Sequence, residues 1–318
     1  MRAMVREEYA APLEPRDVPE PAIGAGGVLV RVRAAGVDQG VWHVVTGLPY
    51  AVRLAGFGLR RPKLPVPGLD VAGVVAAVGP GVTGLRLGDE VFGACDGAFA
   101  QFAASDERRL ARKPARVSFE QAATVASSGV AALQGLRDAG RLRAGQRVLV
   151  LGAGGAVGTF AVQIAVALGA EVTGVCSAAK AGLVRSLGAA HVVDYARQEP
   201  QGRWDLVLDT GGARPLRALR RLLTPAGTLV IVGAEGGGRW LQGSDRQLRA
   251  GLLGAFTRQR LTGLMAKVGP EPLETLRAMM DDGRVSPAID RTFPLDQANE
   301  AIACLRSGRV RGKLALTI

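Results

Sequence analysis

The sequence predicts an α/β protein built from a doubly wound parallel sheet and a second, barrel-like β domain. The chain has 318 residues, which is too long for one typical hydrophobic core and suits two. Residues 1–120 read as short strands separated by Gly and Pro, a pattern typical of a closed β domain. From about residue 121 strand and helix patterns alternate, which is typical of a parallel sheet covered on both faces.

The N-terminal part contains three strand patterns. Val28–Ala34 alternates apolar and polar residues, as a half-buried strand does. Asp70–Val78 is more continuously apolar and ends at Gly79-Pro80-Gly81, and Gly88–Phe92 looks like a turn that leads into a further strand.

The alternating part begins near Ser118. Ser118–Gln121 has the pattern of a helix N-terminus, and an Ala-rich helical stretch follows to about Leu136. The predicted strands are Arg147–Leu151, Glu171–Cys176, His191–Asp194, Asp205–Asp209 and Thr228–Gly233. The predicted helices between them are Ala156–Leu168, Lys180–Leu187 and Pro215–Leu223. Such strand–helix–strand units wind right-handed into a doubly wound fold.

Composition excludes several classes of protein. Hydrophobic residues make up 48% of the chain and charged residues 21%, an ordinary globular balance. Three separated cysteines and two histidines provide neither a disulfide framework nor a cluster of metal ligands. The N-terminus lacks the apolar core of a signal peptide, and glycines interrupt the long apolar run Val148–Ala170. We expect a cytoplasmic protein with no membrane partner.

The net charge of +12 raises the question of a polyanionic partner. The basic residues are spread along the chain, and the cluster at 108–116 is not interleaved with aromatic residues. We therefore interpret the charge as a solvated, arginine-rich surface and do not expect nucleic acid as a partner.

The strongest functional signal is a glycine-rich turn between a strand and a helix. Gly152, Gly155 and Gly158 follow the apolar run Val148–Leu151 and open an amphipathic helix. In dinucleotide-binding folds such glycines allow a tight turn, close approach of a pyrophosphate and close helix packing. The backbone of Ala156 and Val157 then lies at the positive end of the helix, where phosphate binds.

The end of the second strand indicates which dinucleotide is bound. NAD-binding proteins usually carry Asp or Glu there, which holds the ribose 2′-hydroxyl. Here the chain reads Cys176-Ser177-Ala-Ala-Lys180, so a hydroxyl and an ammonium replace the carboxylate, and Tyr195 follows the next strand. We predict NADP(H), although Ser177 as a helix cap and Lys180 as a solvated side chain are the alternatives.

Seven motifs are spread over the whole chain: Pro67–Gly73, Gly88–Val91, Gly97–Phe102, Gly152–Gly158, Leu187–Tyr195, Asp205–Asp209 and Gly308–Lys313. With these motifs in this order, the chain resembles the quinone oxidoreductase (zeta-crystallin-like) branch of the medium-chain dehydrogenase/reductase superfamily. The resemblance implies a GroES-like β-barrel catalytic domain of residues 1–120 completed by 266–318, and a Rossmann NADP(H)-binding domain of residues 121–265, with the active site between them. Gly233 and Lys313 complete the expected cofactor-binding residues.

Zinc-dependent members of this superfamily hold a metal at three positions that here read Asp38, Leu69 and the Ala126–Ser128 region. A catalytic zinc ion needs about three good N, S or O ligands, so we expect no zinc. Without a Lewis acid, a quinone or an α,β-unsaturated carbonyl is an easier hydride acceptor than a simple ketone.

Candidate proton donors cluster in residues 38–50. Relatives have Asn-Pro-x-Asp where this chain reads Asp38-Gln39-Gly40-Val41, so substrate handling does not transfer directly. Tyr50 is a hydroxyl donor or an aromatic wall, His43 is a proton relay or a packed residue beside Trp42, and Asp38 is a new carboxyl group.

These observations lead to three hypotheses. The first is an NADPH-dependent reductase of quinones or enones that works without zinc on a small-molecule substrate, as a homodimer. The second is a dedicated biosynthetic enoyl reductase. The third is a non-catalytic NADPH-binding protein of the same fold, with RNA as its candidate ligand.

Overall fold

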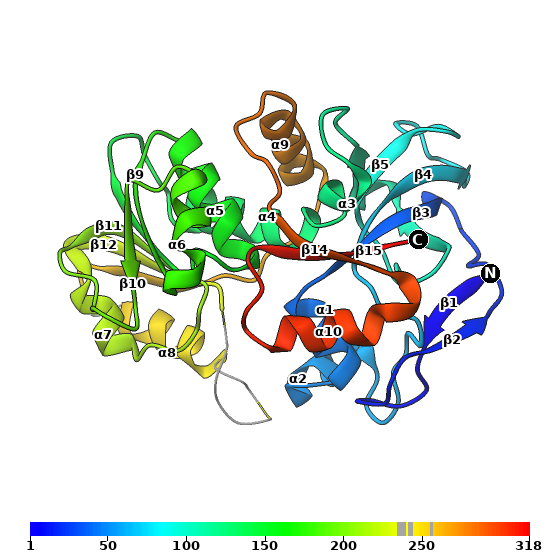
Figure 1. Cartoon of the computed structure of the whole chain (residues 1–318), viewed down its shortest axis with the longest axis horizontal. Coiled ribbons are helices and arrows are strands. Elements are labelled where there is room, and N and C mark those ends of the chain that lie inside the picture. The colour runs from blue at the N-terminus through cyan, green and yellow to red at the C-terminus, as the bar shows by residue number, and fades with distance from the viewer. Residues whose placement is uncertain (234–239, 241–243, 255–256) are drawn as a thin grey trace. The chain divides into compact units, whose positions relative to one another are not determined.

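The computed structural model describes residues 1–318 except 234–239, 241–243 and 255–256 (Figure 1). Two compact units make up the chain: Met1–Val130 with Val268–Ile318, and Ala131–Lys267. Each is described by itself below.

The second unit is built on a six-stranded parallel sheet. Its strands follow the order β10-β9-β8-β11-β12-β13, which is the order 3-2-1-4-5-6 of the doubly wound Rossmann fold. The bounds are β8 Arg147–Leu151, β9 Glu171–Cys176, β10 His191–Asp194, β11 Trp204–Asp209, β12 Leu223–Ile231 and β13 Arg260–Gly263. The central strand β8 is buried from its second residue onward, and Leu149 lies between Thr173 of β9 and Val207 of β11.

Among the described residues, four α-helices lie wholly within this unit. They are α5 Ala156–Ala167, α6 Ala178–Ser186, α7 Leu216–Arg221 and α8 Ser244–Gly254. Helix α5 contacts β8 and β9, and α6 contacts β9 and β10. Most of α5 is buried, which explains why its sequence is apolar nearly all round.

The sequence predicted incorrect bounds for strand β12 of this unit. Thr228–Gly233 was the predicted strand, whereas β12 begins at Leu223 and ends at Ile231. The backbone N–H groups of Val232 and Gly233 both donate to the Asp209 carbonyl, which ends the regular ladder.

The first unit contains a mixed sheet of seven strands with the path β14-β15-β3-β4-β5-β7, and β6 pairs with β3. A separate pair, β1 Arg2–Val5 and β2 Glu14–Asp17, is antiparallel. The sheet strands are β3 Gly27–Val37, β4 Asp70–Val78, β5 Glu90–Ala94, β6 Phe102–Asp106, β7 Leu110–Arg112, β14 Ile289–Pro294 and β15 Lys313–Thr317. Strand β15 lies between β14 and β3, so the C-terminal segment completes the N-terminal sheet (Figure 1).

The α-helices of the described part of the first unit are α1 Gln39–Thr46, α2 Tyr50–Val52, α3 Phe119–Ala122, α9 Pro270–Asp281 and α10 Ala298–Arg306. Helix α4 Ala126–Leu133 begins in this unit and ends just beyond its boundary at Val130. The predicted capping box is present, because Ser118 and Gln121 exchange side-chain and backbone hydrogen bonds. The predicted continuous helix to Leu136 is wrong: it breaks after Ala122, where the Thr124 hydroxyl donates to the Gln121 carbonyl, and a π-helical turn follows α4.

Residues 121–130, which the sequence placed with the cofactor-binding domain, belong to the first unit. The cause is close packing on β3: a Cβ atom added at Gly36 would lie 2.5 Å from the Ala123 carbonyl oxygen. The absence of a side chain at Gly36 lets this segment lie directly on the strand.

Within the described ranges, no helix is long and apolar enough to cross a membrane.

Candidate cofactor and active site

The glycine-rich turn has the geometry that the sequence predicts. Gly152 has φ +81°, in the left-handed region that favours glycine, and a Cβ atom at Gly158 would lie 2.1 Å from the Gly152 carbonyl oxygen. Gly155 is the N-cap of α5, where no side chain caps the helix. Because the first N–H groups of a helix lack intrahelical partners, Ala156, Val157 and Gly158 present donors at a positive helix end.

The end of β9 carries the other predicted cofactor residues. Ser177 is the N-cap of α6 but its hydroxyl makes no capping hydrogen bond, and Lys180 is the third residue of that helix. Tyr195 is 57% exposed, and its N–H donates to the Cys176 carbonyl across to β9. The carboxylate in the neighbouring strand, Asp194, accepts from the Ala196 N–H and lies 3.6 Å from Arg197.

Sequence reasoning missed a buried ion pair at the carboxyl end of β11. Asp209 is 1% exposed, and its carboxylate lies 2.7 Å from an Nη atom of Arg246 in α8. The other carboxylate oxygen accepts from the Gly212 N–H, and the Asp209 carbonyl accepts from Gly233. Because Asp209 also accepts from Gly233, the ion pair helps to hold the backbone beside Gly233. No local sequence pattern indicates that Asp209 and Arg246 form a pair.

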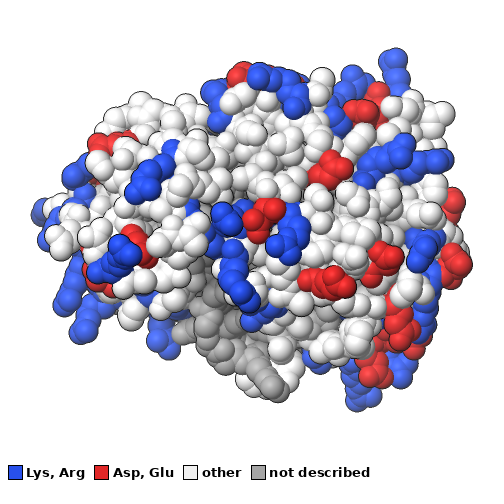
Figure 2. Space-filling model, viewed as in Figure 1, with Lys and Arg blue, Asp and Glu red and all other residues white. Residues whose placement is uncertain are grey.

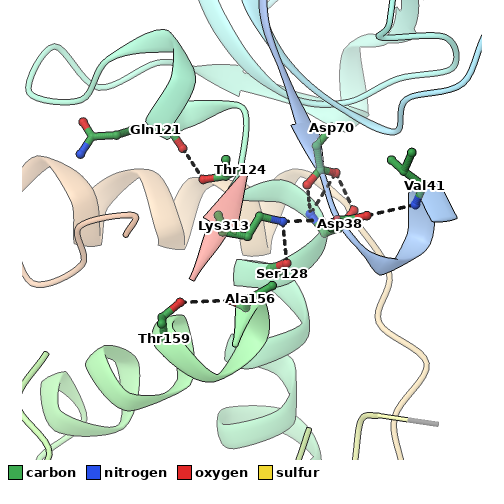
Figure 3. A network of polar contacts seen from close by, with 10 residues as sticks. Asp38, Val41, Asp70, Gln121, Thr124, Ser128, Ala156, Thr159 and Lys313 are labelled. Carbon is green, nitrogen blue, oxygen red and sulfur yellow. Dashed lines mark hydrogen bonds and ion pairs between the residues drawn. The ribbon is translucent and has the colours of Figure 1, made fainter. Parts of the chain in front are cut away.

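A second polar network lies inside the first unit, around the ammonium group of Lys313 (Figure 3). Lys313 has no exposed surface, and its Nζ atom lies 2.9 Å from the Ser128 hydroxyl and 3.4 Å from the Asp38 carboxylate. Asp38 also caps α1 by accepting from the Val41 N–H. We expected Lys313 to contact the cofactor and Asp38 to be catalytic. In the structure the two side chains are buried and contact each other.

Asp70 is the third charged member of this network. Its carboxylate accepts from the backbone N–H and the hydroxyl of Ser127. Burial, followed by the nearby charge of Asp38, raises the pKa of Asp70 to about 7, although Lys313 and Ser127 oppose the shift.

The three positions that the resemblance matched to zinc ligands are close to one another in the structure. A Cβ atom at Gly40 would lie 3.2 Å from both Leu69 and Asp38, and Ser128 reaches the same ammonium as Asp38. Leu69 offers no donor atom, and in the described part of the chain no three His, Cys, Asp or Glu side chains form a metal-binding group. The donor set at this place therefore suits a lysine ammonium rather than a zinc ion.

The remaining proton-donor candidates lie on α1 and α2. His43 packs edge-on against Trp42, and its Nδ1 atom lies 2.7 Å from the Leu48 carbonyl oxygen. Nδ1 must therefore carry a hydrogen, so a neutral His43 directs its N–H at the backbone.

Tyr50 begins α2, and the guanidinium of Arg53 lies 4.9 Å from its ring centre. Arg53 also stacks on Tyr9 at 4.3 Å and donates to the Gly47 carbonyl. Arg53 thus holds the Tyr50 ring in place, a role that the sequence alone did not indicate.

Cys95 is buried, which raises the pKa of its thiol and makes the thiolate unfavourable. Cys304 is half-buried and lies near the end of α10.

Comparison with known proteins identifies the family. The alcohol dehydrogenase GroES-like domain model matches residues 24–115, and a model described as zinc-binding dehydrogenase matches residues 187–316. A 2-methylene-furan-3-one reductase of Solanum lycopersicum is 30% identical over 94% of this chain and 74% of its own length. The chain belongs to the medium-chain dehydrogenase/reductase family. It is an oxidoreductase with a nicotinamide cofactor and a small-molecule substrate.

Two further proteins are similar to this chain over nearly its whole length. A chloroplast envelope quinone oxidoreductase homolog of Arabidopsis thaliana is 29% identical over 99% of this chain and 97% of its own length. The spectinabilin polyketide synthase system protein NorB of Streptomyces orinoci is 36% identical over 98% of this chain, which spans 14% of that protein.

Solved structures agree with the fold. A quinone oxidoreductase from Coxiella burnetii superimposes with a TM-score of 0.84 at 24% identity, covering 100% of this chain and 99% of that one. A mycobacterial protein in complex with NADPH superimposes with a TM-score of 0.82 at 26% identity, with 100% coverage of both chains. The predicted combination of a Rossmann sheet and a GroES-like domain is confirmed.

The raised pKa of Asp70 gives a testable dependence of stability on pH. Because the folded protein keeps a proton that the unfolded chain releases near pH 4, the protonated carboxyl stabilises the fold at low pH, and this contribution is lost as pH rises through about 7. In Asp70→Asn this pH-dependent contribution should be absent. Relative to the variant, the wild type should lose up to about 1.4 kcal/mol of unfolding free energy per pH unit between about pH 5 and 7.

Urea denaturation at a series of pH values measures this difference. Asp17→Asn, an exposed aspartate of β2, is the control and should follow the wild type. Parallel pH profiles for the wild type and Asp70→Asn would contradict the assigned protonation.

Proposed function

We propose that this oxidoreductase is an NADPH-dependent reductase that transfers hydride to a quinone or an α,β-unsaturated carbonyl without zinc. The observation that carries the proposal is the pairing of a glycine turn shaped for a pyrophosphate with a β9 end that offers Ser177 and Lys180 in place of a carboxylate.

The residues present fit the cofactor. Gly155 has no side chain between the turn and a ligand, and a Cβ atom there would already lie 3.3 Å from the Gly152 carbonyl oxygen. The donors of Ala156 and Val157 would hold the pyrophosphate, and Ser177 and Lys180 would hold the 2′-phosphate, with Tyr195 beside them. Asp194 does not oppose this, since its carboxylate is already paired with Arg197 and Ala196. When bound, NADPH supplies the hydride.

The polar network at Lys313 supports an activated acceptor. At the positions that the resemblance matches to zinc ligands, Leu69 offers no donor atom, and the Asp38 carboxylate and the Ser128 hydroxyl of the Ala126–Ser128 region both contact the Lys313 ammonium. A quinone or enone needs only hydrogen bonds to the developing oxyanion and a proton, whereas a simple ketone needs stronger polarisation. Two relatives are named for such chemistry, and a 2-methylene-furan-3-one is itself an unsaturated ketone.

Tyr50 is the favoured proton donor on the described residues. Its ring is held by Arg53, whereas the N–H of a neutral His43 faces the Leu48 carbonyl. Asp38 is removed from this role because it caps α1 and pairs with Lys313.

The basic charge does not require a nucleic-acid partner. Within the cluster at 108–116, Arg109, Arg112 and Lys113 each form an ion pair with an acidic residue. On the face shown in Figure 2, Lys and Arg side chains stand in small groups, several of them beside Asp or Glu.

A second candidate is a dedicated biosynthetic enoyl reductase. The favouring observation is the 36% identity to a polyketide synthase component across 98% of this chain. The two candidates differ in the acceptor, which is an enoyl thioester in the second and a free quinone or enone in the first.

Steady-state oxidation of NADPH with a panel of quinones, free enones, enoyl thioesters and simple ketones tests the proposal. We expect turnover with quinones or free enones, no turnover with simple ketones and no loss of activity in a metal chelator. Turnover with enoyl thioesters alone would establish the second candidate. Oxidation of simple alcohols with NADP, or loss of both activity and a tightly bound metal in chelator, would contradict the proposal.

The cofactor preference is tested at Lys180. Lys180→Ala should lower the ratio of NADPH to NADH affinity by about tenfold or more, because a hydrogen bond to a charged group is worth about 1.5–3 kcal/mol. Fluorescence titration with each cofactor measures this ratio. Lys267→Ala removes an exposed lysine from the same unit and is the matched control; equal losses for both cofactors in Lys180→Ala would defeat the assignment.

A further inference from the structure

Gly154 lies in the turn between β8 and α5, and the side chain of Lys180 passes directly over it. A Cβ atom built on Gly154 would lie 2.7 Å from Cβ, 2.8 Å from Cδ and 3.2 Å from Cγ of Lys180. Carbon atoms that are not bonded prefer separations of about 3.5–4.0 Å. The stem of the lysine therefore occupies the space that any side chain at position 154 would need.

Backbone conformation does not explain a glycine at this position. Gly152 has a positive φ, and Gly158 packs against the Gly152 carbonyl, but the φ of Gly154 lies outside the left-handed region. An alanine is compatible with such a backbone. The three atoms nearest to the added Cβ all belong to Lys180, so the lysine stem is the contact that favours glycine at this position.

The contact cannot be relieved by rotation of the lysine alone. Lys180 is in the first turn of α6, and its N–H donates to the carbonyl of Ser177, the N-cap residue. Side-chain rotation moves Cγ and Cδ, but Cβ is fixed by the helix backbone. A side chain at position 154 would therefore displace the first turn of α6 together with Ser177.

We propose that Gly154 is a specificity-determining residue for NADPH, because it lets Lys180 lie across the glycine turn and so sets where its ammonium and the Ser177 hydroxyl meet a ribose 2′-phosphate. This inference rests on the proposed cofactor. This role differs from contact with the pyrophosphate. Gly154 would affect the binding of the ribose 2′-phosphate through the position of Lys180.

The test compares Gly154→Ala with Gly182→Ala by titration with NADPH and NADH. Gly182 lies in the same helix as Lys180, and a Cβ atom there meets nothing within 4 Å, so its variant is a matched control. We expect Gly154→Ala to lower the NADPH to NADH affinity ratio about tenfold, comparable with loss of one hydrogen bond to a charged group. Gly182→Ala should leave that ratio within twofold of the wild type, an allowance of about 0.4 kcal/mol.

A double-mutant cycle separates a role through Lys180 from a general effect. In a Lys180→Gly background, which removes Cβ together with Cγ and Cδ, Gly154→Ala should cause no further loss of the affinity ratio. If Gly154→Ala alone does not fold, the Lys180→Gly/Gly154→Ala double variant removes all three close atoms and should fold and bind NADH.

Equal weakening of both cofactors by Gly154→Ala would overturn the inference, as would additive losses in the cycle or an unfolded double variant. Failure of the proposed cofactor has a different signature. In that case the wild type shows no preference for NADPH and Lys180→Ala leaves the ratio unchanged, whatever Gly154→Ala does.

Discussion

The buried ammonium of Lys313 is the interaction on which the first unit depends most. It joins β15 at the C-terminal end of the chain to Asp38, which begins α1, and to Ser128 in α4, while Asp70 of β4 binds the neighbouring Ser127. A buried charge that loses its partner costs about 3–5 kcal/mol. The network therefore makes the sheet, the boundary segment and the helix before Tyr50 parts of one structure, and it includes Asp38 and Ser128 at positions that the resemblance matched to zinc ligands.

In the second unit the corresponding constraint is steric. The turn after β8 works because glycine hydrogens replace side chains at three positions, each for a different reason: a positive φ at Gly152, contact with the lysine stem at Gly154 and contact with the Gly152 carbonyl at Gly158. In the proposed function the same turn would hold the pyrophosphate, and it would set the position of the α6 residues that recognise a 2′-phosphate. Asp209 and Arg246 fix a further stretch of backbone at the carboxyl end of the sheet.

The sequence predicted those features that depend on local patterns. Mainly apolar runs located β8 and β9, because buried parallel strands must be apolar on both faces, and the Ser118 capping box is a short-range signal. It did not predict features that depend on distant partners. Lys313 and Asp38 are 275 residues apart, and the place of residues 121–130 follows from a glycine in β3. The assigned roles of Tyr50, Ser177 and Lys180 remain predictions.

Transfer of deuterium from NADPH labelled at C4 of the nicotinamide tests the central claim most directly. The reaction is run with an enone in ordinary water, with each of the two C4 stereoisomers in turn, and the product is analysed by mass spectrometry. The account predicts one deuterium on the β-carbon of the product from one stereoisomer and none from the other. A reduced product without deuterium from either stereoisomer would contradict direct hydride transfer to the activated acceptor.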